Sequence, residues 1–314
     1  MAEAPVPLVL AATGATGFIG RHVLEAARAR GHRLRALARR PQEDRPGVTW
    51  IPGSLEDGES LARLVEGADA VVHVAGITNA RNRRVFEAGN ILGTAAVRAA
   101  AGGRPLVAVS SLAARAPQLS VYGETKRRAE DVVRGAAGRW AILRPPAVYG
   151  PGDGALLPLF RAAHRLGRLP LPGRGVAAMI YAEDLARAIV ALAEDLAGPA
   201  WAAGGLFEID DGTGGHRPSA IAAAIGEAVG RRVRAVPLPR PALYAAALVE
   251  TTAAALAGRL PRLSLDRAGY LAHPDWSADS RPFLALGLWQ PETALAEGMT
   301  TTARWYRTMG LLPA

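Results

Sequence analysis

The chain has 314 residues, 50% of them hydrophobic and 21% charged, a composition typical of a globular protein and not of a disordered or fibrous one. It contains no cysteine, which excludes disulfide bonds, thiolate metal sites and a cysteine nucleophile. A formal charge of +9 makes nucleic acids and anionic membranes candidate partners. The arginines are scattered, however, and no nucleic-acid-binding motif accompanies them, so we expect no nucleic-acid partner.

Short apolar runs alternate with amphipathic helical patterns over the first half of the chain. Strands are expected at residues 6–12, 33–38, 70–74, 106–110 and 140–143. Helices are expected at residues 18–30, 59–66, 83–101 and 122–136. This alternation predicts βαβ units, and therefore an α/β fold with a parallel sheet and right-handed crossovers.

The pattern changes after residue 150, where Pro and Gly become frequent. Further helices are expected near residues 182–196, 219–229 and 242–257. We divide the chain into residues 1–175 and a smaller, mostly helical part at residues 176–314. The boundary is soft, because no sharp linker is present and later segments are expected to return to the sheet.

The sequence shows no signal peptide and no membrane span. The apolar run at the N-terminus lacks a basic flank and ends in a glycine-rich turn, so it is interpreted as the first strand. No stretch reaches the roughly 18 apolar residues of a membrane span. The nearest approach, residues 242–258, contains Glu250 and two threonines. We expect a cytoplasmic protein.

A glycine-rich turn, TGATGFIG, follows the first strand and opens the first helix. Gly14, Gly17 and Gly20 would permit a tight turn, close approach of backbone to a pyrophosphate, and close packing of helix on strand. The helix N-terminus would present unpaired N–H groups to the phosphates. This context predicts a dinucleotide-binding domain at residues 1–175 and a substrate-binding part at residues 176–314.

The end of the second strand bears on the choice of nicotinamide cofactor. NAD sites usually place Asp or Glu there, to bind the ribose 2′-hydroxyl. This chain has no acid at that point and continues with Arg39, which could bind a 2′-phosphate through charge-assisted hydrogen bonds. The sequence therefore favours NADP(H) over NAD(H).

A serine, a tyrosine and a lysine form the predicted catalytic group. Ser111 ends the fourth strand, and Tyr122 and Lys126 lie four residues apart on one helix face. An ammonium beside a phenol stabilises the phenolate, which allows tyrosine to exchange a proton near neutral pH. Lys126 is the only lysine among 37 basic residues, which suggests a task that arginine does not perform.

These motifs, in this order, resemble the extended (atypical) short-chain dehydrogenase/reductases, which include the NAD(P)-dependent epimerase/dehydratases. Further matches are DAVVHVAG, NILGT, LRPPAVYGPG and IYAEDL, which begin at residues 69, 90, 143 and 180. The resemblance implies a doubly wound Rossmann sheet and hydride transfer with Ser111, Tyr122 and Lys126 as the triad. It gives Asn90 a supporting role, and His73 is interpreted as a strand residue near the cofactor.

The same resemblance, with the glycine turn and Arg39, implies a set of residues that bind the cofactor. Ser54 departs from the family, which often has an adenine-contacting Asp there. The set is Gly14, Thr16, Gly17, Phe18, Ile19, Arg39, Ser54, Leu55, Val74, Ala75, Tyr122, Lys126, Pro145 and Val148. No His, Asp and Glu cluster has the spacing of metal ligands, so no metal is expected.

Two departures from the nucleotide-sugar enzymes bear on the substrate. The interval between Ser111 and Tyr122 is short for epimerases and dehydratases, and no carboxylate follows Ser111 as dehydration would require. Simple ketone reduction or alcohol oxidation is favoured. The C-terminal part resembles the steroid-dehydrogenase-like and complex-I-accessory-subunit-like branches, whose bacterial relatives include lipid ketone reductases that act on oxidised ceramides.

The leading hypothesis is an NADP(H)-dependent reductase of a bulky, lipid-like ketone such as a 3-keto sphingolipid. Two alternatives stay open, a nucleotide-sugar epimerase of the same family and a non-catalytic NADP(H)-binding accessory protein. The apolar helix at residues 242–257 has basic flanks and could rest on an anionic membrane at its inner face. Burial in the substrate-binding part is the preferred interpretation, because Ala-rich helices are usually buried.

Overall fold

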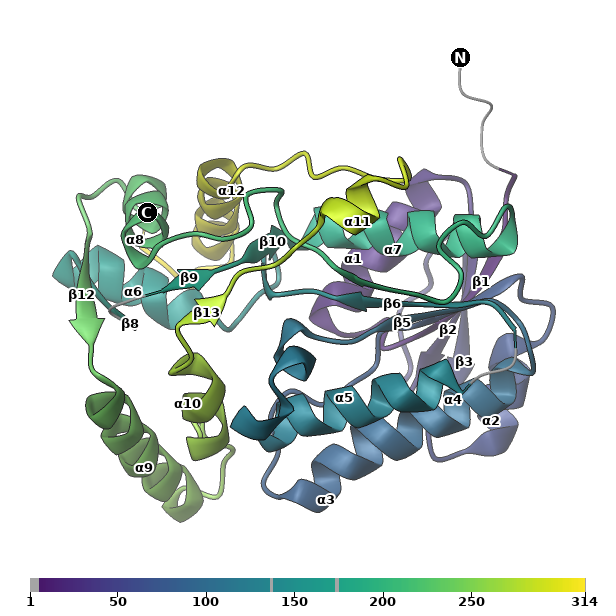
Figure 1. Ribbon diagram of the computed structural model, residues 1–314, viewed down its shortest axis with the longest axis horizontal. Coiled ribbons are helices and arrows are strands. Elements are labelled where there is room, and N and C mark those ends of the chain that lie inside the picture. Colours follow the sequence, from purple (N-terminus) through teal and green to yellow (C-terminus); the bar gives the residue numbers. More distant parts are fainter. Residues whose placement is uncertain (1–5, 136–137, 173–174, 314) are drawn as a thin grey trace.

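A seven-stranded parallel sheet forms the centre of the structure, a computed structural model that describes residues 6–135, 138–172 and 175–313 (Figure 1). The strand order is β11-β6-β5-β4-β1-β2-β3. The strands are β1 (Val9–Thr13), β2 (Arg33–Ala38), β3 (Val48–Pro52), β4 (Ala70–His73), β5 (Leu106–Val109), β6 (Trp140–Arg144) and β11 (Gly205–Glu208). This sheet confirms the predicted doubly wound Rossmann fold.

Helices cover both faces of the sheet, as Figure 1 shows. One face carries α1 (Phe18–Ala29) and α7 (Ala182–Ala197), which pack side by side on a core of aliphatic residues. The other face carries α2 (Gly58–Val65), α4 (Gly93–Ala101) and α5 (Val121–Arg134). Strands buried on both faces explain the nearly continuous apolar runs in the sequence.

Strand β3 was not among the predicted strands. It is a five-residue edge strand, half exposed, and it ends in Pro52. Proline is tolerated at a sheet edge because its missing N–H faces solvent there. A short strand with weak alternation gives little periodic signal, which is why the sequence pattern did not reveal it.

The single helix expected at residues 83–101 has three parts. These are α3 (Arg83–Phe86), a π-helical segment (Glu87–Leu92) and α4. The π-helical turn places Asn90 inside the structure, where it is almost fully buried. Such turns insert one extra residue and are frequent at functional sites. The helix expected at residues 122–136 ends at Arg134, and residues 136–137 lie outside the described residues.

The second part of the structure is built from both halves of the chain. Three parallel strand pairs join segments that are distant in the sequence: β7 (Ala147–Tyr149) with β10 (Met179–Tyr181), β8 (Arg168–Pro172) with β12 (Arg234–Leu238), and β9 (Val176–Ala177) with β13 (Asp275–Trp276). Helix α7 and strand β11 belong to the Rossmann part although they follow residue 175. The division of the chain into a cofactor-binding part and a substrate-binding part at residue 175 therefore stays a prediction.

This second part also contains α6 (Leu157–Leu166), α8 (Pro218–Ala228), α9 (Arg240–Leu256), α10 (Leu265–Leu271) and α12 (Leu295–Thr308). Helix α11 (Arg281–Leu284) instead places Phe283 in the core of the Rossmann part. Helices α6, α8 and α12 share a second core with aromatic residues at its centre. Helices α9 and α10 form a separate pair beside the sheet (Figure 1). In the part of the chain that the structure describes, no helix combines the length and apolarity that a bilayer crossing requires.

Candidate active site

The glycine turn brings three backbone segments into contact. Gly14 has φ of +74°, and a Cβ added there would lie 2.5 Å from the backbone nitrogen of Ala75. A Cβ added at Gly20 would lie 2.0 Å from the Gly14 carbonyl oxygen. Only glycine satisfies both contacts, because larger residues would push β1, β4 and α1 apart. Gly17 caps α1 without a side-chain hydrogen bond, so the helix presents backbone N–H groups at this turn.

The other predicted cofactor residues follow the carboxyl ends of neighbouring strands, where α/β sheets bind ligands. Thr16, Phe18 and Ile19 surround the glycine turn, and the Phe18 ring packs edge-on against His22. Residues 54 and 55 follow β3, residues 74 and 75 follow β4, and Pro145 follows β6. Most of these residues therefore follow the carboxyl edge of the sheet, and Val148 lies on β7 outside it.

Two of these positions have informative surroundings. Arg39 directly follows β2 and is exposed, and within the described residues its guanidinium forms no hydrogen bond or ion pair. Ser54 accepts a hydrogen bond from the backbone N–H of Glu56 at 3.3 Å, so its hydroxyl organises the turn before α2. Leu55 packs against α4, where a Cβ at Gly93 would lie 2.8 Å from its Cδ1.

The structure brings Ser111 and Tyr122 together. Ser111 follows β5 and caps a short 3₁₀ helix (Leu112–Arg115) by accepting a hydrogen bond from the Ala113 N–H at 3.2 Å. Tyr122 lies in the first turn of α5, with the Ser111 side chain close enough to lower the pKa of its hydroxyl. Burial raises the pKa of Tyr122 to about 12, and the Ser111 side chain partly opposes that rise.

Lys126 lies one turn further along α5 and is buried. Its Nζ donates a hydrogen bond to the Val109 carbonyl oxygen at 2.7 Å, which fixes the ammonium at the end of β5. Burial lowers the pKa of Lys126 to about 8, against the opposing field of Glu130. A buried ammonium this close to neutral titration is characteristic of functional lysines.

Asn90 ties the loop after β4 to α5. Its Oδ1 accepts from the Ile77 N–H at 2.7 Å, and its Nδ2 donates to the Ile77 carbonyl oxygen and to the Thr125 hydroxyl, both at 3.0 Å. All of these atoms are buried or half-buried, so the amide has no free polar group. This geometry matches the supporting role that the family resemblance implies.

His73 is enclosed between two hydroxyl groups. Its Nδ1 lies 2.7 Å from Thr13 Oγ1, and its Nε2 lies 3.0 Å from Thr94 Oγ1. Burial, with the nearby charge of Lys126, lowers the pKa of His73 to about 3, which keeps the ring neutral. Both ring nitrogens are occupied, so the geometry favours a strand residue that orders the site over a general base.

A buried ion pair beneath the site was missed by the sequence analysis. The Arg144 guanidinium donates two hydrogen bonds of 2.7 Å to the carboxylate of Glu130, which also accepts from the Ser110 hydroxyl at 2.6 Å. These three residues join the ends of β5 and β6 to α5. Ser110 precedes Ser111, Arg144 precedes Pro145, and Glu130 lies one helical turn after Lys126. The available signal was a carboxylate one helical turn after the lysine.

Helix α10 covers the other side of Tyr122 and was also missed. The Asp266 carboxylate accepts from the backbone N–H groups of Val121 (2.6 Å) and Tyr122 (3.4 Å), so a distant segment caps α5. The Tyr270 ring centroid lies 6.1 Å from that of Tyr122, and the Phe86 centroid lies 6.4 Å away. Aromatic rings on two sides give Tyr122 an apolar wall.

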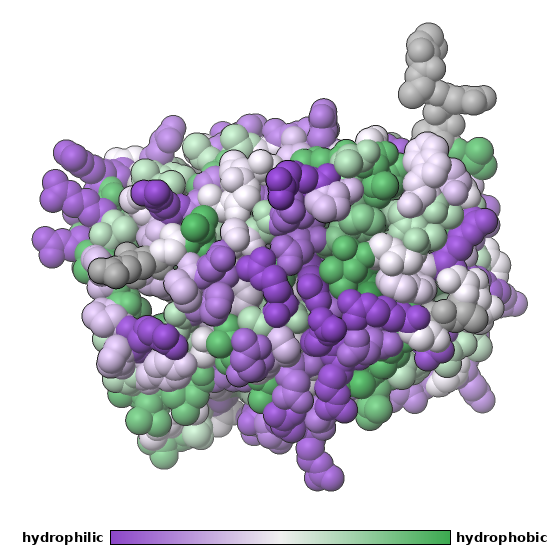
Figure 2. All heavy atoms as spheres, in the orientation of Figure 1, coloured by the Kyte–Doolittle hydropathy of each residue, from purple (hydrophilic) through white to green (hydrophobic). Residues whose placement is uncertain are grey.

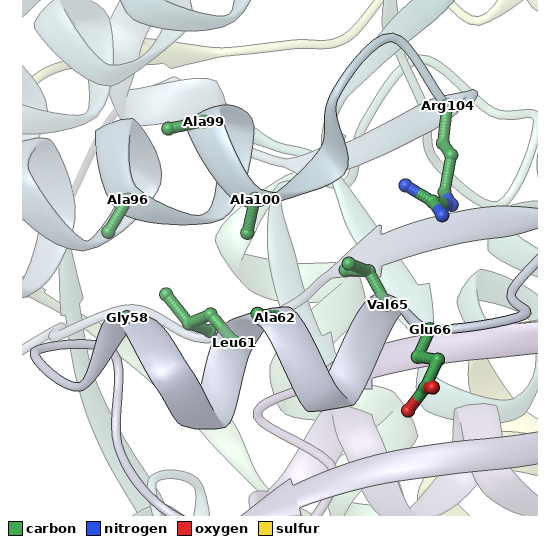
Figure 3. A pocket seen from close by; sticks show the side chains of 9 residues that line it. All are labelled: Gly58, Leu61, Ala62, Val65, Glu66, Ala96, Ala99, Ala100 and Arg104. Carbon is green, nitrogen blue, oxygen red and sulfur yellow. The ribbon is translucent and has the colours of Figure 1, made fainter.

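A surface hollow lies away from these residues, between α2 and α4 (Figure 3). It has a volume of about 590 Å³, and Glu66 and Arg104 stand at one end of an otherwise apolar lining. None of the predicted site residues lines it. The hollow is therefore a separate surface feature of the Rossmann part.

Comparison with known proteins identifies the class. The NAD(P)H-binding family profile matches residues 14–195, more than half of the chain. The protein therefore belongs to this family of Rossmann-fold enzymes, the extended short-chain dehydrogenase/reductases, as its motifs predicted. It binds a nicotinamide dinucleotide and is an enzyme of the oxidoreductase and epimerase type.

Particular relatives narrow the comparison. The chain is 38% identical over 313 residues to a protein of Caulobacter vibrioides named ceramide reductase. The match covers 97% of this chain and 96% of that protein. The chain is 31% identical to a 2-alkyl-3-oxoalkanoate reductase of Stenotrophomonas maltophilia, over 64% of this chain and 69% of that one.

The solved structures of similar proteins support the same fold. An example is MoeE5 in complex with UDP-glucuronic acid and NAD, at 22% identity and a TM-score of 0.73, with coverage of 96% of this chain and 99% of that one. At this level of identity the likeness establishes the Rossmann architecture alone.

The buried ion pair generates the first prediction. Glu130→Gln should lower the free energy of unfolding by about 3–5 kcal/mol, because it leaves the Arg144 charge buried without its partner. The double variant Glu130→Gln/Arg144→Met should recover part of that loss. Urea denaturation of the wild type, both single variants (Glu130→Gln and Arg144→Met) and the double variant measures both effects. A single variant as stable as the wild type would contradict the interpretation.

Proposed function

We propose that the protein is an NADP(H)-dependent reductase that converts the ketone of a long-chain, lipid-like substrate to an alcohol. The observation that carries this proposal is the buried ammonium of Lys126, fixed on the Val109 carbonyl oxygen one helical turn from Tyr122, with Ser111 near the phenol. Ser111 follows the carboxyl end of β5, and β4 separates this strand from β1 and its glycine turn.

The residues present fit a dinucleotide. Glycine at position 14 lets the turn pack closely on the backbone of Ala75 after β4, and the N-terminus of α1 offers free backbone donors at this turn. Arg39 would bind a 2′-phosphate, and Lys126 would hold the nicotinamide ribose. When bound, the cofactor supplies the hydride for carbonyl reduction.

The protein's own residues would manage the proton. Tyr122 is a neutral phenol below pH 12, so it can donate its proton to the substrate's carbonyl oxygen and become a phenolate. The positive charge of Lys126 and the hydroxyl of Ser111 would stabilise that phenolate. Ser111 can also donate a hydrogen bond to the carbonyl oxygen, which holds it beside Tyr122.

The substrate class is supported by the relatives and by the walls of the site. The names ceramide reductase and 2-alkyl-3-oxoalkanoate reductase describe reductions on molecules with apolar chains. A third relative, from Stigmatella aurantiaca, is named as the ketoreductase of a farnesylated 3-oxo quinoline oxide. Tyr270 and Phe86 give the proton donor aromatic neighbours that suit such chains. A 3-keto sphingolipid, such as an oxidised ceramide, is the substrate we propose.

The main test is NADPH oxidation with 3-keto ceramide, 3-keto steroids, aldehydes and UDP-sugars. We expect turnover of the keto lipid, and Tyr122→Phe should lower kcat at least a hundredfold because it removes the proton donor. NADPH binding, followed by fluorescence, should stay within about threefold, since the phenol ring is kept.

Two results would overturn the assignment. Unchanged turnover in Tyr122→Phe would remove tyrosine from the chemistry. Turnover of UDP-sugars without keto lipids would favour an epimerase, and no turnover of any substrate despite tight NADPH binding would favour an accessory protein.

Lys126 generates a pH prediction. Its pKa of about 8 means that the ammonium loses its proton as pH rises above 8, and support for the phenolate is lost with it. The kcat/KM for NADPH, which reports ionisation of the free enzyme, should therefore fall above pH 8. His73, with a pKa near 3, does not titrate there. Lys126→Arg should be severely impaired, and its residual activity should show no such fall; an unaltered profile in that variant would contradict this origin.

The cofactor preference rests on Arg39. Arg39→Ala should weaken NADPH binding roughly tenfold to a hundredfold, the loss expected when charge-assisted hydrogen bonds to a phosphate disappear. NADH binding should change little, because NADH has no 2′-phosphate. Arg33→Ala, an exposed arginine at the opposite end of β2, is the matched control. Equal losses for both cofactors would disprove the preference for NADP(H).

A further inference from the structure

Helix α9 presents its larger apolar side chains to solvent. Leu248, Val249 and Leu256 are 56%, 70% and 87% exposed, although the Ala-rich sequence favoured burial of this helix. Figure 2 shows the result as a mostly hydrophobic area where α9 lies in Figure 1, at the lower left. Exposed apolar patches of this kind mark interaction surfaces.

Only a narrow stripe of α9 packs against the protein. Leu243 and Ala247 form a small core with Ala268 and Ala272 of α10, and Ala254 continues the same stripe. At 100° per residue, Leu248, Val249 and Leu256 lie on the opposite side of the helix. The protein core therefore explains one side of α9 and leaves the more apolar side without a partner in the described residues.

The exposed side carries no charge along the length of the helix. Between Arg240 and Arg259 the only charged residue is Glu250, which is half-buried and accepts hydrogen bonds from the Arg259 guanidinium (2.7 Å) and the Arg262 backbone N–H (3.0 Å). Thr252 lies on the exposed side, but its hydroxyl donates to the Leu248 carbonyl oxygen at 3.0 Å. Its polar group is thus already satisfied, as an apolar environment requires.

Arginines stand at both ends of this surface. Arg240 opens α9, Arg259 and Arg262 follow it, and Arg81 donates to the Gly258 carbonyl oxygen at 2.8 Å. An apolar helix face with one arginine at its start and several at its end has the charge pattern of a helix that lies in the headgroup region of an anionic bilayer.

A second copy of the chain fits the same surface poorly. A two-fold dimer would pack this face on itself, in either helix orientation. Because both ends of α9 carry arginine, either orientation would bring like charges together. Anionic lipid headgroups would instead pair with those arginines while acyl chains cover the leucines.

We propose that α9 docks this enzyme on the surface of a membrane that contains anionic lipid, with Leu248, Val249 and Leu256 inserted between the lipids. The choice of a bilayer rests in part on the lipid-like substrate proposed above. Helix α10, packed directly on α9, contacts Tyr122 through Tyr270 and caps α5 through Asp266. The docked helix therefore adjoins the wall of the active site, where a lipid substrate would enter.

The test is flotation of the full-length protein with vesicles. Wild-type protein should float with vesicles of phosphatidylglycerol and phosphatidylcholine in equal parts, bind pure phosphatidylcholine more weakly, and lose affinity as salt rises. Leu248→Glu/Leu256→Glu should bind roughly tenfold or more weakly, because two carboxylates replace the inserted side chains. Leu166→Glu is the matched control, since Leu166 is 66% exposed on α6, and it should float like the wild type.

Two further measurements separate the explanations. NADPH binding by the double variant should equal that of the wild type, which shows that it folds. Failure of the wild type to float, or equal flotation of all three proteins, would overturn the docking proposal and leave the reductase proposal intact. Sedimentation that shows a wild-type dimer, lost in the double variant, with no vesicle binding would identify a second copy as the occupant.

Discussion

The structure depends on keeping one lysine ammonium inside the protein. Lys126 is buried, and in the described residues its charge is met by the Val109 carbonyl at 2.7 Å and by Glu130 one helical turn away. Burying a charge costs several kcal/mol unless fixed dipoles replace the lost water. This cost is lowered because the last carbonyl group of β5 accepts a hydrogen bond from the ammonium. The Glu130–Arg144 ion pair ties α5, which carries the lysine, to the end of β6 beside β5.

This constraint explains why a chain with 36 arginines keeps a lysine here. The ammonium is a compact point charge that fits between a backbone carbonyl and the loop after β4, where a Cβ at Gly76 would lie 3.5 Å from Nζ. A guanidinium is planar, larger and charged at every accessible pH. An arginine could supply the positive charge, but its head group is too large for this space, and its pKa could not be lowered toward neutral pH.

The sequence revealed those parts of the site that short spacings encode. The glycines, Ser111, Tyr122, Lys126 and Asn90 stand in motifs whose chemistry requires a fixed local geometry. The residues that it did not reveal act across long separations. Asp266 caps α5 from 145 residues away, and Arg144 reaches Glu130 only because β6 lies beside β5. No periodicity in the sequence indicates such contacts, because they depend on the order of strands and on how the C-terminal segments return.

The second part of the structure follows the same logic. Two of its strand pairs join β7 and β8, which precede residue 175, to β10 and β12, which follow it, so these pairs cross the predicted boundary. Composition also failed to predict the environment of α9, because alanine and leucine suit a protein core and a lipid surface equally well. The difference lies in which face is covered. In α9 one stripe with Leu243 and Ala247 packs inward, whereas Leu248, Val249 and Leu256 face out, and the lipid surface that we propose would cover these outward side chains.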